Sequence, residues 1–332
     1  MKNKRFLITV VLMLVLSMIL AACGRTQSGG TENENEGEVT EENKDLSLLT
    51  GGTGGTYYPL GGEIAKIVSN ETDLNITAQS SGASVENMQT LADGDADLAF
   101  TQTDIANYAS EGTLMFEGHA INNIQAIGAL YPETIQIVTL KDSGINSVED
   151  LKGKTVSVGA PGSGTFANAQ QILEIHGISI KDDIKAQHLA FDESTEGIQD
   201  GNIDAAFITA GAPTGAVESL SALKEVKIIP ITADKADELA EKYPYYAKNV
   251  IPQGTYQLDK EVETVAVLAM LVARQDLSED MVYNITKALF DNIASIQHAK
   301  GEQISAEKAL DGVGIDLHPG AKRYFDEKGI SQ

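Results

Sequence analysis

A short motif that occurs twice, 107 residues apart, constrains the fold of this chain more than any other feature. The segment DGDADLAF at 93–100 and the segment DGNIDAAF at 200–207 share the frame D-G-x-x-D-x-A-F. Glycine-containing loops keep nearly the same offset, because GGTY at 54–57 aligns with SGTF at 163–166, 109 residues later. This spacing is too long for a solenoid repeat. It predicts two similar lobes that face each other across a cleft.

The first glycine loop, GGTGGTYYPLGG at 51–62, directly follows the apolar run at 46–50. Glycines at the end of a strand let backbone N–H groups approach another group, because no Cβ intervenes. The loop is not a Walker phosphate loop, since it lacks the GxxxxGK[ST] arrangement, and Tyr57 occupies the third glycine position of a dinucleotide fingerprint. It therefore predicts a cradle for another ligand, with an ordinary tight turn between strand and helix as the alternative.

Strand-like runs alternate with amphipathic segments of helical length from residue 46 onwards. This alternation is typical of an α/β fold with mainly parallel strands. The predicted strands are 46–50, 74–79, 97–101, 155–158, 205–209 and 227–231, and the predicted helices include 84–92, 193–199, 279–299 and 319–328. We expect one lobe to comprise 46–140 and 263–332 and the other to comprise 141–262. Two crossings between the lobes predict a hinge of few residues.

The first 45 residues predict export and a lipid anchor. Basic residues, an apolar run from Phe6 to Leu20 and small residues before Cys23 form the pattern of a signal peptide at 1–22. The apolar run is short for a transmembrane helix, which is the alternative. Cys23 is placed like the lipidated cysteine of a bacterial lipobox. Residues 23–45 are polar and acidic, which predicts a flexible tether between the membrane and the folded part.

Charge and residue counts exclude several classes of partner and cofactor. The formal net charge is −24, and it becomes −27 once the signal peptide is removed. Such an acidic protein is a poor partner for nucleic acid or anionic lipid. The single cysteine excludes a disulfide, and no two of the five histidines stand four residues apart as in a metal-binding helix. We expect no cofactor and no metal.

Glycines and hydroxyl side chains follow several of the predicted strands. The segments are 51–62, QSSGASVEN at 79–87, FTQTD at 100–104, GAPGSGTF at 159–166 and FITAGAPTGAV at 207–217, which contains Thr209. Open α/β sheets bind ligands at the carboxyl ends of their strands, and helix N-termini there offer unpaired N–H groups. The loops therefore predict a clamp for a small carboxylate. Ser84 has an alternative role as a helix N-cap.

Several of these segments, together with HPGAKRYFDEKG at 318–329, resemble the TAXI family of extracytoplasmic solute-binding proteins, which serve tripartite ATP-independent periplasmic (TRAP) transporters. The resemblance covers about 46–332. It implies a two-lobed periplasmic-binding-protein fold, type II-like, that closes on glutamate, 2-oxoglutarate or a related dicarboxylate and delivers it to an ion-driven membrane permease. We expect a monomer. The implied ligand-binding residues are Thr53, Gly55, Thr56, Tyr57, Ser81, Ala83, Ser84, Gln102, Asp104, Ser163, Gly164 and Thr165.

After the tether, the chain contains only two arginines, Arg274 and Arg323, and neither is evidently placed to bind a carboxylate. Backbone amides, hydroxyls and Tyr57 or Tyr256 are then expected to hold the ligand. An extracellular lipoprotein enzyme, a ligand-sensing protein and an adhesin are the alternatives. The repeated acids Asp97 and Asp204 could form a carboxylate pair, but their place at the starts of strands favours a structural role in turns. No GxSxG nucleophile motif occurs.

Overall fold

The computed structural model describes residues 43–331, so the predicted signal peptide, Cys23 and most of the tether lie outside the described residues. The strands are β1 (Asp45–Leu49), β2 (Asn75–Gln79), β3 (Leu98–Gln102), β4 (Ile124–Leu140), β5 (Thr155–Ser157), β6 (Lys185–Gln187), β7 (Ala205–Ala210), β8 (Val226–Ile229), β9 (Ala247–Ile251) and β10 (Val262–Arg274). The α-helices are α2 (Tyr57–Glu71), α3 (Ser84–Ala92), α4 (Thr103–Glu111), α5 (Gly164–Ile175), α6 (Phe191–Asp200), α7 (Gly215–Ser221), α8 (Ala233–Lys242), α9 (Glu279–Asp291) and α10 (Pro319–Lys328).

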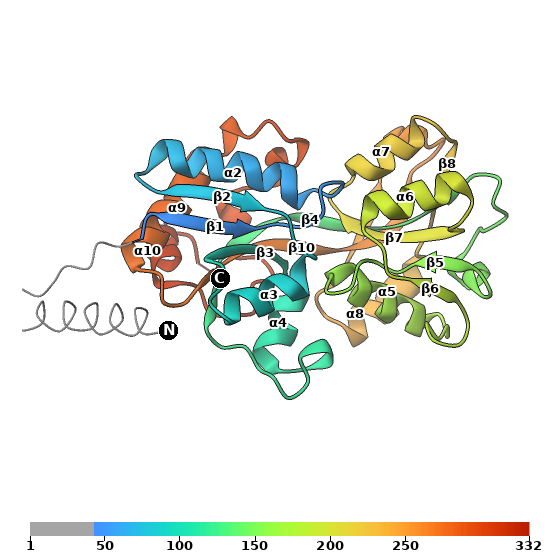
Figure 1. The fold of residues 1–332 in the computed structure, drawn as a ribbon, viewed down its shortest axis with the longest axis horizontal. Coiled ribbons are helices and arrows are strands. Elements are labelled where there is room, and N and C mark those ends of the chain that lie inside the picture. Colours follow the sequence, from blue (N-terminus) through green and yellow to red (C-terminus); the bar gives the residue numbers. More distant parts are fainter. Residues whose placement is uncertain (1–42, 332) are drawn as a thin grey trace, which may run out of the picture. The chain divides into compact units, whose positions relative to one another are not determined.

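The six predicted strands are confirmed as β1, β2, β3, β5, β7 and β8. Two sets of three parallel strands, β2-β1-β3 and β6-β5-β7, form the two ends of the sheet. The long strands β4 and β10 join these sets, and they pair antiparallel with each other and with their neighbours β7 and β3. Figure 1 shows the two resulting lobes, with β4 and β10 running between them. The fold is therefore mixed α/β, with a central sheet flanked by helices.

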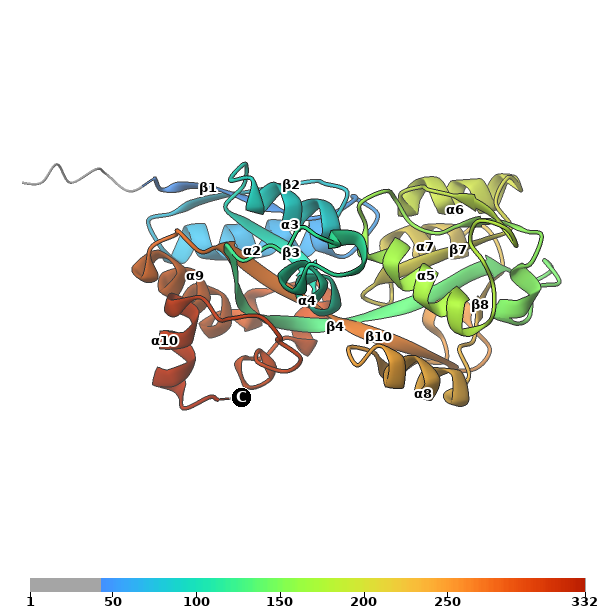
Figure 2. The ribbon, with the colours of Figure 1, turned by 90° about the horizontal axis from the view of Figure 1, so that it is seen from below.

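Each lobe has two apolar cores, one on each face of its sheet, because side chains alternate along a strand. In β3, Phe100 packs with α2, α9 and α10, whereas Ala99 packs with α3 and α4. In β7, Phe207 packs with α5 and α8, whereas Ile208 packs with α6 and α7. Helices thus cover both faces of the sheet in each lobe (Figure 2). The sequence repeat corresponds to two structural units of one design.

The repeated acids have equivalent structural roles. The Asp97 carboxylate accepts hydrogen bonds from the backbone N–H and the hydroxyl of Ser47 at 2.8 and 2.9 Å. The Asp204 carboxylate accepts one from the backbone N–H of Thr155 at 2.7 Å. Each acid therefore fastens the start of β3 or β7 to the neighbouring strand, at the opposite end of the strand from the cavity described below. This arrangement supports the structural role expected for both residues.

The strands β4 and β10 contribute to the cores of both lobes. Ile127 belongs to the first-lobe core and Ile137 to the second-lobe core, and Leu271 and Val265 are divided in the same way. The chain therefore passes from lobe to lobe within these two strands. The predicted lobe boundaries at 140/141 and 262/263 stay predictions. No helix within residues 43–331 is long and apolar enough to cross a membrane.

Candidate functional site

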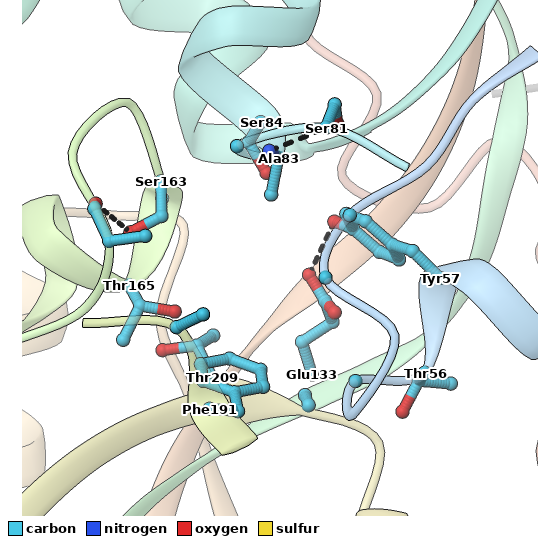
Figure 3. A pocket seen from close by; sticks show the side chains of 18 of the residues that line it. Thr56, Tyr57, Ser81, Ala83, Ser84, Glu133, Ser163, Thr165, Phe191 and Thr209 are labelled. Carbon is cyan, nitrogen blue, oxygen red and sulfur yellow. Dashed lines mark hydrogen bonds between the residues drawn. The ribbon is translucent and has the colours of Figure 1, made fainter. Parts of the chain in front are cut away.

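A cavity of about 70 Å³ lies between the loops of the two lobes (Figure 3). The loops before α2 and α3 and the end of β3 line it from the first lobe, and the loops before α5 and α6 and the end of β7 line it from the second lobe. Glu133 of β4 also lines it. Its lining residues are Gly51, Gly52, Gly55, Thr56, Tyr57, Ser81, Gly82, Ala83, Ser84, Gln102, Glu133, Ala160, Ser163, Gly164, Thr165, Ala190, Phe191, Thr209 and Ala210. The cavity is small and mostly apolar, with a few convergent polar groups, which is typical of a small-molecule site.

Most of the candidate residues from the sequence meet at this cavity. Those that line it are Gly55, Thr56, Tyr57, Ser81, Ala83, Ser84, Gln102, Ser163, Gly164, Thr165 and Thr209. They come from the segments that lead into α2, α3 and α5 and from the ends of β3 and β7. The glycine loop at 51–62 contributes through Gly51, Gly52 and Gly55. Whether these residues bind a ligand stays a prediction.

Three candidate residues do not line the cavity. Thr53 is exposed, and its hydroxyl donates to Asp192 at 3.3 Å. Asp104 is fully buried behind the wall formed by Gln102. Tyr256 belongs to a second-lobe core, where its hydroxyl accepts from the backbone N–H of Thr214 at 2.6 Å.

The hydroxyl groups of Ser163 and Thr209 at the cavity differ in whether they have hydrogen-bond partners among the described residues. The Ser163 hydroxyl donates to the Ala160 carbonyl at 2.7 Å and accepts from the Phe166 N–H at 3.2 Å, so that it caps α5. By contrast, the buried Thr209 hydroxyl has no hydrogen-bond partner among the described residues. A buried polar group without a partner is costly. Thr209 is therefore the hydroxyl that a ligand would most readily engage.

The N-termini of α3 and α5 differ in whether protein groups already accept hydrogen bonds from their backbone N–H groups. Ser84 is the first residue of α3, and Ala83, with φ of 76°, stands at the N-cap, so the expected alternative role of Ser84 as N-cap is wrong. The Gly162 carbonyl of the other lobe accepts from the N–H groups of Val85 and Glu86, both at 3.0 Å. These N–H groups in the first turn of α3 already have a hydrogen-bond acceptor in the protein. The first two residues of α5, Gly164 and Thr165, line the cavity, and a helix N-terminus leaves some N–H groups without intrahelical partners.

Other hydrogen bonds cross between the lobes around the cavity. The Thr56 hydroxyl donates to the Gly211 carbonyl at 3.4 Å, and the Ala216 N–H donates to the Gly54 carbonyl at 3.1 Å. The amide of Gln102 donates to Asn168 at 2.9 Å. These contacts hold the loops of the two lobes together. The described conformation is therefore a closed one.

Glu133, in the middle of β4, is the acidic side chain that lines the cavity, and sequence reasoning missed it. Its carboxylate accepts a hydrogen bond from the Tyr57 hydroxyl at 2.6 Å (Figure 3). Burial raises the pKa of Glu133 to about 8, despite the Tyr57 hydrogen bond, which lowers it. A lone acid within a long apolar strand is the signal that could have identified this residue.

A second buried acid, Asp104, lies in a polar network that joins the lobes. Its carboxylate accepts from the Asn168 amide at 3.0 Å, and Asn168 also donates to the Tyr246 hydroxyl at 2.7 Å. The other carboxylate oxygen of Asp104 has no partner among the described residues. Burial raises the pKa of Asp104 to about 7. The network connects α4 of the first lobe with α5 of the second.

The two raised pKa values predict that stability falls as the pH rises. Asp104 and Glu133 have folded-state pKa values of about 7 and 8, above the ordinary values of 3.8 and 4.5 for these side chains. The folded protein thus holds more protons than the unfolded chain between about pH 4 and pH 8, and in that range unfolding becomes easier with each added pH unit. We expect Asp104→Asn and Glu133→Gln each to flatten the pH dependence of the urea midpoint. An unchanged pH profile in both variants would contradict the assignment.

The basic residues in the described part of the chain lie outside the cavity. Among the described residues, no lysine, arginine or histidine lines the cavity. Arg274 pairs with Asp97 at 3.5 Å at the far end of β3, and Arg323 pairs with Glu279 at 2.9 Å on the surface of α10. His318 is buried as the N-cap of α10. The arrangement offers no cation for a carboxylate and, within residues 43–331, no cluster of metal ligands.

Comparisons with known proteins agree with this architecture. A protein from Bordetella bronchiseptica RB50 is 19% identical, with a TM-score of 0.54 over 86% of this chain and 82% of that chain. PhnD1 from Prochlorococcus marinus, solved with methylphosphonate, is 15% identical, with a TM-score of 0.52 over 87% and 97%. A protein described as a periplasmic transporter is 14% identical, with a TM-score of 0.53 over 87% and 95%. The fold is therefore that of periplasmic binding proteins.

The sequence itself matches one family model over nearly the whole described part. The match spans residues 48–329 and is to the NMT1-like family. It includes both lobes, both long strands and every loop of the cavity. The chain belongs to the NMT1-like family.

Proposed function

We propose that this protein is an extracytoplasmic solute-binding protein that captures a small organic anion by closing its lobes. The anion is glutamate, 2-oxoglutarate or a related dicarboxylate, and the protein delivers it to a TRAP-type membrane permease as a TAXI-type subunit. It acts as a monomer without a cofactor, anchored to the bacterial cell membrane through a lipid on Cys23. Binding rather than catalysis is its role.

The observation that carries this proposal is the cavity itself. Loops at equivalent places in the two lobes surround it, and hydrogen bonds between the lobes close it. The buried Thr209 hydroxyl on its wall has no hydrogen-bond partner within residues 43–331. The family and the fold support the same reading, because the structurally similar PhnD1 was solved with a small anion, methylphosphonate. The choice of TRAP over other transporters rests on the sequence resemblance.

We expect Thr209→Val to reduce ligand affinity without destabilising the empty protein. Valine has nearly the same shape as threonine, and the change removes a buried hydroxyl that has no partner among the described residues. A thermal-shift screen of the purified, ligand-free protein against C4 to C6 dicarboxylates, amino acids and 2-oxoacids identifies the ligand first, because binding to the folded state raises Tm. For that ligand, Thr209→Val should raise Kd at least about tenfold, a difference of ~1.4 kcal/mol.

Thr139→Val is the matched control. Thr139 is also fully buried, but its hydroxyl donates to the Asp204 carbonyl at 2.7 Å, away from the cavity. Its replacement should lower stability by about 1 kcal/mol and leave Kd unchanged. A folded, ligand-free protein whose Tm responds to none of these acids would refute the small-anion proposal. An equal change of Kd in both variants would remove Thr209 from the site.

A further inference from the structure

Glu133 presents one oxygen of its carboxyl group to the cavity. It lies in β4, lines the cavity and is 2% exposed. The Tyr57 hydroxyl donates to Oε2 of this carboxyl at 2.6 Å (Figure 3). The other oxygen, Oε1, makes no hydrogen bond within residues 43–331, and it is not one of the polar atoms that the protein encloses completely. Oε1 is therefore the part of the carboxyl that a ligand can reach.

No positive charge compensates Glu133. The titratable groups that act on it are Tyr57 of α2, Tyr131 of β4 and Asp104 of α4, and none of them is a cation. Among the described residues, no basic side chain lines the cavity. A buried carboxylate without a cation is unfavourable, so the carboxyl takes up a proton. The raised pKa of Glu133, about 8, agrees with a neutral carboxyl in the empty cavity at pH 7.

Tyr57 determines which oxygen of Glu133 carries that proton. A neutral carboxyl has one oxygen that donates and one that accepts. Because the Tyr57 hydroxyl donates to Oε2, Oε2 is the accepting oxygen and the proton belongs on Oε1. Tyr57 is itself held in place, since its ring is buried and stacks on Phe100 with the ring centroids 4.8 Å apart. The cavity thus contains a fixed hydrogen-bond donor.

We propose that Glu133 binds the anionic group of the ligand as a neutral acid, by donating a hydrogen bond from Oε1, so that the anion and the proton are held together. This inference rests on the proposed function and deepens it, because it names the group that recognises the anion where no arginine or lysine is present. An O–H group that donates to an oxyanion forms one of the stronger hydrogen bonds. Thr165 lines the same cavity from the second lobe, and its hydroxyl can donate as well.

The proposal makes ligand affinity depend on pH. The free carboxyl of Glu133 is mostly protonated below its pKa of about 8, and above this pH it becomes a carboxylate that repels an anion. A bound anion stabilises the protonated form and raises the pKa further. The Kd should therefore rise by about tenfold between pH 7 and pH 9. Binding should take up about one proton from solvent at pH 9 and almost none at pH 7.

Isothermal titration calorimetry on the purified, ligand-free protein tests this dependence. The probes are succinate, glutarate and 2-oxoglutarate, in which no group titrates between pH 6 and pH 9, and L-glutamate. Measurements in two buffers of different ionisation enthalpy give Kd and the number of protons exchanged at each pH. The main readout is the ratio of the Kd of the wild type to that of Glu133→Gln, because the titration of Asp104 or of the ligand affects both proteins. We expect this ratio to rise about tenfold from pH 7 to pH 9.

Three variants assign the effect to the proton of Glu133. Glu133→Gln keeps an acceptor for Tyr57 and an N–H donor for the ligand but cannot ionise, so at pH 7 its Kd should stay within about threefold of the wild-type value. Glu133→Met has a similar length and no donor, and it should raise Kd at least about tenfold at pH 7. Gln125→Met should leave Kd unchanged, because Gln125 lies in β4 outside the cavity. Circular dichroism confirms that each variant is folded.

The outcomes separate this inference from the proposed function. If Glu133→Gln weakens binding at pH 7 as much as Glu133→Met, the ligand needs the ionised carboxylate and the inference is wrong. A ratio that stays constant up to pH 9, or binding at pH 9 without proton uptake, would also overturn it. In each of these cases an acid still binds, so the proposed function stands. Failure of all four acids to bind the folded, ligand-free protein would reject both.

Discussion

Phe100→Ala is expected to lower the free energy of unfolding by about 3–5 kcal/mol. Phe100 is fully buried in the larger first-lobe core, and its ring stacks on Tyr57 with the ring centroids 4.8 Å apart. Removing the ring leaves a cavity that the flanking β1 and α2 cannot fill without moving. Urea unfolding followed by circular dichroism measures the loss, which corresponds to a decrease of roughly 10 °C in Tm.

The same substitution should also disturb the site, because Tyr57 depends on Phe100 for its position. Tyr57 donates to Glu133, so a loosened Tyr57 ring weakens the support of the acid in the cavity. Tyr58→Ala is the control: Tyr58 is the next residue of α2 but is 40% exposed, and its loss should change stability by less than about 0.5 kcal/mol. A cost for Phe100→Ala below ~1 kcal/mol would show that the core is not packed as described.

One type of substitution, glycine to alanine, should have opposite effects in two helices. Gly320 is near the start of α10, and a Cβ there would lie 2.3 Å from the Glu279 carbonyl oxygen and 2.4 Å from the Tyr283 nitrogen. Both are backbone atoms of α9 or its start, so the helices must separate. We expect Gly320→Ala to cost about 1–3 kcal/mol or more, measured as a lower urea midpoint.

Gly62→Ala provides the opposite case. Gly62 is inside α2, and no atom lies within 4 Å of the place where its Cβ would stand. Alanine is the better helix former by about 1 kcal/mol, so the variant should be more stable than the wild type. Destabilisation by Gly62→Ala, or a neutral Gly320→Ala, would contradict the packing of the corresponding helix.

Local sequence patterns were sufficient for the parts of the fold that repeat. The strands β3 and β7 were predicted because each is short, follows a D-G-x-x-D turn and leads into a polar loop. The strands β4 and β10 were not predicted as strands. They are buried on both faces, so their side chains show no alternation between apolar and polar, and such a run cannot be assigned by periodicity alone. Their identity depends on pairing between distant segments.

The candidate site was predictable where it consists of loops with a motif. Thr56 and Ser163 follow predicted strands and Thr209 ends one, and the structure brings all three to one cavity. Glu133 and Phe191 were missed because no glycine or hydroxyl motif surrounds them. The place of Glu133 depends on the register of β4, in which it lies opposite Val267 of β10. That register depends on packing between segments far apart in the sequence, so a local sequence pattern does not predict it.

The two long strands also determine how one lobe can move against the other. Both connections are continuous backbone within a sheet, so neither swings freely as a loop would. Any rotation of one lobe against the other must bend or twist the two-stranded ribbon formed by β4 and β10. The pairing is irregular between Leu268 and Met270 and between Leu271 and Val272, and such irregularities increase strand curvature. We therefore expect the cavity to open by bending of this ribbon and not by a swing about a flexible loop.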